Sequence, residues 1–283
     1  MKRFKQILIL TVAVTLMSFM VDKPIKVEKL TIKEIDNSVA KVGDKLYACK
    51  YELSNGIYLQ FLQSLQTEGK TELIKTATLD TNNWVDKLAY NAPYKDYYYR
   101  HPAYANYPVV NVSWEAANLF CKWLTDFYNS DANRKYKKVV FRLPSAAEWE
   151  TAARGGDNSY IYSWGYPLLQ NGLWAANYKH IGDEFITYDT LKKQIVVDRS
   201  IDGPAFQLNN AADITAPVDS YKPNGFGIYN TCGNVAEMIN EKGIACGGGW
   251  RSTGGDIRIA SRMRYTKSAS DIGFRYFMEI MEE

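Results

Sequence analysis

The stretch PVDSYKPNGFGIYNTCGNVAEM, from Pro217 to Met238, governs the interpretation of this chain, and GGGWR follows it at Gly247 to Arg251. Glycines and asparagines recur in the first segment at positions 224, 225, 227, 230, 233 and 234. Because these residues supply positive φ angles and Asx turns, the pattern predicts a structured loop rather than a helix. The side-chain oxygens of Asn230 and Glu237, with backbone carbonyls between them, suit a calcium ion. The alternative is that the same residues only build turns.

A set of motifs extends this signal across the chain in a fixed order: PVVNVSWEAANLFCKWL, FRLPSAAEWETAARGG, YSWG, PNGFGIYNTCGNVAEM, GGGWR and DIGFR. Together they resemble the formylglycine-generating enzyme family, the sulfatase-modifying factor domain, which includes many catalytically silent bacterial members. The resemblance runs from about Tyr47 to Phe277 and begins with KYELSNGIYLQFLQSL at Lys50 to Leu65. It implies an irregular α+β fold related to C-type lectins, with little regular secondary structure.

The domain organisation follows from length and motif order. A chain of 283 residues with 46% hydrophobic content can bury a sizeable core, and the ordered motifs favour one domain over two. We predict a signal peptide or N-terminal anchor over residues 1–20, a linker or strand over 21–44, and a formylglycine-generating-enzyme-like domain over 45–283. The formal net charge of +3 is too small to indicate a nucleic-acid partner or an anionic membrane surface.

The N-terminus has the pattern of a secretory signal. Lys2, Arg3 and Lys5 precede an apolar run from Ile7 to Met20 that is short for a membrane span. We therefore expect export to the periplasm, the outer membrane or the extracellular space, with an uncleaved anchor as the alternative. No cysteine precedes Cys49, which argues against lipid attachment just after the apolar run, and no later segment is apolar enough to cross a bilayer.

The cysteines lie at positions 49, 121, 232 and 246, an even set that allows three pairings in an exported protein. Cys121 falls on the inward face of a predicted helix and is expected to be a buried thiol. A bridge between Cys232 and Cys246 is the one disulfide we consider plausible. With only His101 and His180 in the chain, a zinc or non-haem iron site lacks ligands.

Local patterns predict helices that begin at Ser54, Ser113 and Ser145, and short strands at Val109–Val112 and Val139–Arg142. Ser145 and Glu148 have the capping-box spacing. The predicted inward faces of the three helices are Tyr58, Phe61, Leu62 and Leu65; Ala117, Phe120, Cys121, Leu124 and Tyr128; and Trp149, Ala152 and Ala153. The resemblance implies that Arg142, Glu148, Glu150 and Arg154 form structural ion pairs.

The resemblance also implies two calcium sites. The first would use the side chain of Asn177 and the carbonyl of Tyr178, but the family's usual aspartate is absent from NNAADITAPV. Either Asn210 or Asp213 could replace it, after a long insertion at about 179–207. The second site would use Asn230, the carbonyls of Gly233 and Val235, and Glu237.

The catalytic cysteines of the family are absent from this chain. Family enzymes place two cysteines between GGGWR and GFR, where their thiolates bind copper(I) during oxygen-dependent conversion of a substrate cysteine to formylglycine. Here Ser252 lies near the first position, and no cysteine occurs after Gly247. Because copper(I) requires soft ligands and a serine hydroxyl is not ionised near neutral pH, we predict no catalytic residues and no copper.

Two functions remain open. The first is an exported non-catalytic scaffold, stiffened by calcium, that binds a protein or glycan at the cell envelope, by analogy with silent relatives in gliding motility and type IX secretion. Its predicted ligand surface is a tyrosine-rich loop over residues 84–107, with Tyr97, Tyr98, Tyr99 and Tyr104, together with the insertion. The alternative is a copper- and oxygen-dependent formylglycine-generating oxidase that acts on a cysteine of a sulfatase-type substrate.

Overall fold

The computed structural model describes residues 29–85, 90–166, 168–170, 173–179, 185–189, 191, 193–198 and 212–283, with backbone alone for 185–189 and 194–198. The predicted signal segment, His180, Asn210 and most of the predicted insertion lie outside the described residues. None of the helices in the described ranges is long and apolar enough to span a membrane.

The fold combines short helices and short strands, which confirms the expected α+β class. The helices are α1 (Ile32–Ser38), α2 (Asn55–Thr67), α3 (Thr71–Ala77), α4 (Tyr94–Arg100), α5 (Trp114–Ser130) and α6 (Ala146–Arg154), with 3-10 turns η1 (Thr81–Trp84) and η2 (Pro102–Tyr104). The strands are β1 (Val39–Lys41), β2 (Leu46–Cys49), β3 (Lys138–Arg142), β4 (Leu169–Gln170), β5 (Leu173–Trp174), β6 (Phe185–Asp189), β7 (Gln194–Asp198), β8 (Ala236–Met238), β9 (Ile244–Cys246), β10 (Arg262–Arg264), β11 (Ile272–Gly273) and β12 (Phe277–Glu282).

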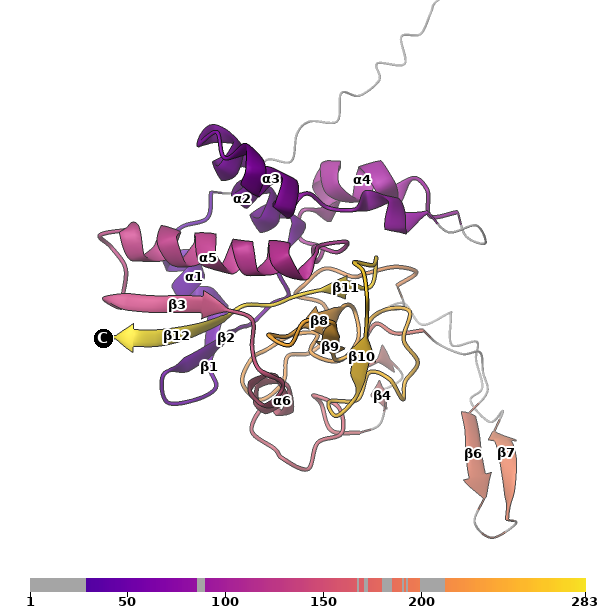
Figure 1. Ribbon diagram of the computed structural model, residues 1–283. Helices are drawn as coiled ribbons and strands as arrows, with labels where there is room; N and C mark the ends of the chain where they lie inside the picture. The colour runs from indigo at the N-terminus through magenta and orange to yellow at the C-terminus, as the bar shows by residue number, and fades with distance from the viewer. Residues whose placement is uncertain are drawn as a thin grey trace, which may run out of the picture.

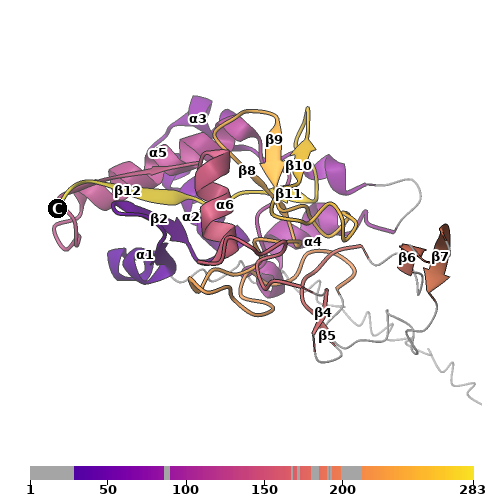
Figure 2. The same cartoon turned by 90° about the horizontal axis from the view of Figure 1, so that it is seen from below.

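Two sheets lie side by side in the described part of the chain (Figures 1 and 2). The first has the order β1-β2-β12-β3 and is antiparallel throughout, so the C-terminal strand lies between strands from the N-terminal half. The second has the order β10-β9-β8-β11, with β11 parallel to β8. Two-stranded ladders β4-β5 and β6-β7 complete the described pairing.

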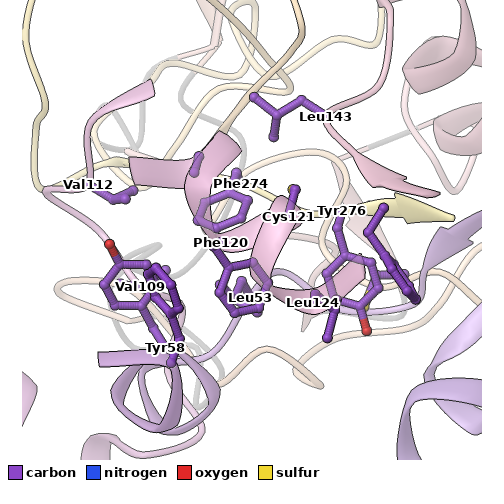
Figure 3. Packing of buried hydrophobic residues seen from close by; sticks show 14 of the residues in the cluster. Leu53, Tyr58, Val109, Val112, Phe120, Cys121, Leu124, Leu143, Phe274 and Tyr276 are labelled. Atoms are coloured by element: carbon purple, nitrogen blue, oxygen red, sulfur yellow. The ribbon is translucent and has the colours of Figure 1, made fainter. Parts of the chain in front are cut away.

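The main core lies between α5 and the strands (Figure 3). Phe120 of α5 packs against Phe274, with ring centroids 5.7 Å apart, and against Phe61 of α2 at 5.5 Å. Every predicted inward residue of α5 and α6 is buried, and on α2 only Leu62 remains partly exposed. The 3.6-residue period of apolar side chains therefore identified these helical faces correctly.

The predicted helix starts are also confirmed. Ser54, Ser113 and Ser145 each accept a hydrogen bond from a backbone N–H of the first helical turn. Ser145 and Glu148 form the complete capping box. A second capping box, between Thr31 and Glu34, begins α1 in a stretch for which the sequence predicted a linker or strand.

The predicted strand at Val109–Val112 is wrong. The Val109 N–H donates to the Leu53 carbonyl and the Asn111 N–H to the Ala269 carbonyl, so this segment bonds to two separate parts of the chain. Asn111 adopts a φ of 60°, which no strand tolerates. The segment is buried, but it joins no ladder.

The predicted disulfide between Cys232 and Cys246 is also wrong, because all four cysteines are free and buried. Both side chains point into one hydrophobic cluster with Trp149 and Ile257. They act there as small apolar residues, as predicted for Cys121.

Candidate functional site

The loop from Pro217 to Met238 has the backbone that its composition predicts, with one difference. Gly227, Gly233, Asn230 and Asn234 all have positive φ. Gly225 instead allows a close approach, since a Cβ there would lie 2.2 Å from the Gly155 carbonyl oxygen. The loop therefore packs backbone to backbone against the end of α6.

A buried ion pair holds the end of this loop. The Glu237 carboxylate accepts two hydrogen bonds from the Arg275 guanidinium, from Nε at 2.7 Å and from Nη2 at 2.5 Å. The Trp149 indole N–H donates to the same carboxylate at 2.7 Å. Arg275 also donates to the carbonyls of Cys49 and Tyr229. Because both charged side chains are almost fully buried, this pair joins the N-terminal, central and C-terminal parts of the core.

A second buried carboxylate, Glu52, also bonds to this loop. It accepts hydrogen bonds from the side-chain amides of Asn230 and Asn234 and from the Val235 backbone N–H. Burial, followed by repulsion from Glu237, raises the pKa of Glu52 well above its ordinary value. Neither Glu52 nor Arg275 was predicted as a site residue, although each lies in a conspicuous motif, because the partners of both are distant in sequence.

The two predicted calcium-binding sets differ in the oxygen atoms that remain available to a cation. In the second set, the Glu237 carboxylate is already neutralised by Arg275, and the Asn230 amide donates to Glu52 and to loop carbonyls. In the first set, Asn177 Nδ2 donates to the Ile214 carbonyl at 2.7 Å and to Asn234 Oδ1 at 3.1 Å. Its Oδ1 is buried and has no hydrogen-bond partner.

The orphaned Asn177 oxygen is the feature that fits a cation. A buried amide oxygen without a donor is unfavourable by about 1–3 kcal/mol, and a hard cation such as calcium would satisfy it. The backbone carbonyl of Asn177 is occupied by the Asn234 N–H, and Tyr178 is buried with its ring against Trp174. Asp213 is exposed, and within the described ranges no group of three or more His, Cys, Asp and Glu residues could hold a metal.

Ser252, near the position of the family's first cysteine, has a structural role. Its Oγ accepts the Gly249 N–H at 3.0 Å, its N–H donates to the Gly249 carbonyl, and its carbonyl accepts the Lys179 N–H. Gly249 has no space for a side chain, because a Cβ would lie 2.6 Å from the Asp271 carbonyl oxygen. The serine therefore closes a tight turn.

The neighbouring thiols are poorly suited to replace the lost ligands. Cys232 and Cys246 are buried, and burial raises the pKa of each thiol to about 12. Each thiol therefore stays protonated near neutral pH, whereas a copper ligand or nucleophile must be a thiolate.

The predicted structural ion pairs are present. Arg142 contacts Glu148 at 2.7 Å and Glu279 at 2.9 Å. Arg154 lies 3.7 Å from Glu150, which also pairs with Arg262. These contacts join α6 to the two sheets.

The predicted tyrosine surface needs correction at two positions. Tyr98 is fully buried and donates to the Pro108 carbonyl at 2.6 Å. Tyr99 is also buried and donates to the Val110 carbonyl. Both lie on the inward side of α4, so they are core residues and cannot contact a ligand, whereas Tyr97 is 51% exposed and Tyr104 is partly exposed.

The outward tyrosines line a groove of about 420 Å³, which we call the tyrosine groove. Its lining consists of Tyr90, Pro93, Tyr94, Tyr97, His101, Ala103 and Tyr104. The groove lies over α4 and η2, apart from the buried turn at Ser252.

Comparison with known proteins places the chain in a family. Residues 28–280 match the sulfatase-modifying factor enzyme 1-like domain. The chain is 34% identical to a formylglycine-generating enzyme of Streptomyces coelicolor over 139 residues, which cover 48% of this chain and 32% of the relative. It is 29% identical to the formylglycine-generating enzyme of Mus musculus over 280 residues, or 82% of this chain and 65% of the relative. The chain thus spans between about a third and two thirds of the length of these relatives.

Other similar proteins carry different names. The inactive C-alpha-formylglycine-generating enzyme 2 of Bos taurus is 28% identical over 187 residues, which cover 60% of this chain and 49% of that protein. Among solved structures, CarF aligns with a TM-score of 0.49 at 23% identity and covers 83% of this chain and 86% of its own.

Proposed function

This chain belongs to the sulfatase-modifying factor enzyme 1-like domain family, and we propose that it is a non-catalytic member that acts as a calcium-stiffened binding or structural scaffold in the cell envelope. The proposal rests on the position and the hydrogen bonds of Ser252. Its hydroxyl stands near the place where the resemblance puts a copper-binding thiolate, and the Gly249 turn uses that hydroxyl for its own backbone. No cysteine follows in the sequence to supply the second thiolate.

The same reasoning weakens the oxidase alternative. An oxidase would have to recruit Cys246 or Cys232, and burial holds both as protonated thiols. Recruiting either would require opening the hydrophobic cluster around Trp149. Nothing else among the described residues favours this second function.

The role of calcium rests on the orphaned Asn177 oxygen. Calcium there would be held by Asn177 Oδ1, with the Tyr178 carbonyl as a candidate second ligand, and would supply no chemistry beyond cross-linking. Asn177 Nδ2 already links the segment at 177–179 to the Ile214 carbonyl, and a cation on Oδ1 of the same side chain would fix its position further. Such a link would stiffen the turn of Ser252, whose carbonyl accepts the Lys179 N–H.

The binding role and the location rest on exposed features and on sequence. The tyrosine groove offers an aromatic surface over α4 and η2. The N-terminal pattern of basic residues and an apolar run favours export. One group of similar proteins is named as inactive, which is compatible with a silent member.

The proposal is tested by measuring the metal content of the purified protein after mild dialysis, and again after loading with copper(I) under reducing conditions. We expect about one calcium per chain and no stoichiometric copper. Asn177→Ala should lose the calcium, because it removes the side-chain oxygen that would bind the ion. Asn118→Ala is the matched control, since Asn118 donates within α5 to the Trp114 carbonyl, far from the site.

Two results would count against the proposal. Tight binding of one copper ion per chain, lost in Cys246→Ala, would instead support the oxidase function. If the wild-type protein contains no calcium, or if Asn177→Ala contains as much as the wild type, the calcium site is wrong. The proposal of a non-catalytic scaffold would then remain without calcium.

A further inference from the structure

The tyrosine groove is formed by side chains at helical spacing. Tyr94, Tyr97 and His101 follow each other at i, i+3 and i+7 along α4 and its C-cap, so they form one stripe along the helix. Tyr104, on η2, closes the groove from the other side, and Tyr90 stands fully exposed at its entrance. Figure 1 shows α4 at the edge of the molecule, where a ligand can approach.

The inner wall of the groove is supported by the core. The ring centroid of Tyr94 lies 5.3 Å from that of buried Trp84, and Tyr104 lies 5.3 Å from that of buried Tyr98. Trp84 in turn stacks near Trp250, beside the turn of Ser252. Two of the four groove tyrosines are therefore held in place before any ligand arrives, which reduces the entropy lost on binding.

The rings of the groove meet at steep angles. Tyr94 and Tyr104 have an interplanar angle of 84°, His101 and Tyr104 of 72°, and Tyr97 and His101 of 67°. In an edge-to-face pair, one ring face stays uncovered by its neighbour. The groove thus combines aromatic ring surface with tyrosine hydroxyl groups.

Among the described residues, the lining of the groove includes no Asp, Glu, Lys or Arg. A charged ligand would lose hydration there without gaining a counter-charge, which is costly. The polar groups that line it are tyrosine hydroxyls, which both donate and accept, and His101. Because His101 Nδ1 accepts the Ala103 N–H at 3.2 Å, the neutral ring carries its proton on Nε2 as a donor.

We propose that the tyrosine groove binds neutral sugar units of a glycan, an inference that rests on the proposed role as a binding scaffold. A neutral pyranose has an apolar C–H face that packs on an aromatic ring and a rim of hydroxyls that donate and accept hydrogen bonds. A proline-rich peptide is the competing ligand, because such segments also dock in aromatic grooves. The backbone of such a peptide offers mainly hydrogen-bond acceptors, and it fits a row of rings with similar orientations. The rings of the tyrosine groove instead lie at steep angles to one another.

The test is binding measured by isothermal titration calorimetry with the full folded chain. The probes are maltohexaose, cellohexaose, mannohexaose, xylohexaose and chitohexaose as neutral glycans, with hyaluronan as an anionic glycan and decaproline as a peptide. We expect saturable binding of at least one neutral probe and none of hyaluronan. Tyr97→Ala should weaken that binding by about tenfold, which corresponds to about 1.4 kcal/mol.

Matched variants separate a ligand contact from a general effect. Tyr97→Phe keeps the ring and should retain more binding than Tyr97→Ala. Tyr166→Ala removes another exposed tyrosine, 75% accessible and outside the groove, and should leave binding unchanged. Near-ultraviolet circular dichroism checks that each variant is folded; Tyr90→Ala, at the fully exposed entrance, is a second groove variant should Tyr97→Ala not fold.

Each other outcome overturns the inference. Binding of decaproline that depends on Tyr97, without binding of a neutral glycan, assigns the groove to peptides. Binding of hyaluronan in preference to neutral probes contradicts the uncharged lining. If no neutral probe binds, or if Tyr97→Ala and Tyr166→Ala lose binding equally, the groove is not a glycan site. Because the metal measurements above do not depend on this groove, such a failure leaves the non-catalytic scaffold intact.

Discussion

The polar network around Glu237 and the tyrosine groove differ in both chemistry and surroundings. In the network, a carboxylate, a guanidinium and an indole are buried and bonded to one another. In the groove, aromatic rings and hydroxyls line an open hollow. Groups already bonded inside the protein contribute to stability and specify the fold, whereas the exposed ones are available to a partner. We therefore propose the groove, rather than the buried network, as the surface that contacts a partner.

Breaking the network should have the largest effect. Arg275→Met leaves the Glu237 charge buried without its partner and removes donors to two carbonyls, so the free energy of unfolding should fall by about 3–5 kcal/mol. Urea denaturation followed by tryptophan fluorescence measures this. The matched control is Arg262→Met, which removes a half-exposed pair with Glu150 and should cost less than about 1 kcal/mol. Equal losses in the two variants would show that burial of the Glu237 pair has no special weight.

The inward and outward tyrosines of α4 give the next largest contrast. Tyr98→Phe leaves the Pro108 carbonyl without its donor in the core and should lower the free energy of unfolding by about 1–3 kcal/mol. Tyr97→Phe removes an exposed hydroxyl and should change it by less than about 0.5 kcal/mol. Thermal unfolding of the two variants, which differ by one position, measures the difference. A reversed order would mean that the assignment of the inner and outer faces of α4 is incorrect.

A smaller, pH-dependent effect is expected at α6. The Arg142 guanidinium lowers the pKa of Glu148 from 4.5 to about 2. A carboxyl with a lowered folded-state pKa contributes stability above its unfolded pKa, and this contribution is lost as pH falls toward the folded value. Glu148→Gln keeps the capping-box geometry, so it should cost roughly 1 kcal/mol at neutral pH, given partial solvent screening.

The check is the difference in unfolding free energy between wild-type and Glu148→Gln, followed by urea denaturation at several pH values. The difference should shrink steadily from about pH 5 toward pH 2. A difference that stays constant with pH would assign the effect to hydrogen bonding rather than to charge.

The sequence predicted the parts of this fold that depend on local spacing. The inward face of α5, with Phe120 and Leu124, and the capping box of Ser145 follow from helical periodicity and from contacts three residues apart. The strand prediction for Val109–Val112 was wrong because the apolar run matches a buried strand, while its backbone hydrogen bonds go to two different segments. Only the folded chain supplies that information.

The candidate site was less accessible from sequence for two physical reasons. Arg275 reaches Glu237 across 38 residues, a pairing that no local spacing encodes. Tyr97, Tyr98 and Tyr99 are identical neighbours, so composition gives no contrast between an inner and an outer face. Their division depends on the phase of α4 against Trp84, which is set by tertiary packing.

The most direct test of the central claim is whether this chain oxidises a substrate cysteine. The protein, loaded with copper(I) and supplied with oxygen and a reductant, is incubated with a peptide that carries one cysteine in a sulfatase-type sequence, and the peptide is followed by mass spectrometry. The account predicts no conversion of the cysteine to formylglycine, because Ser252 and the buried protonated thiols provide no copper site. Copper-dependent formation of formylglycine that disappears in Cys246→Ala would contradict it.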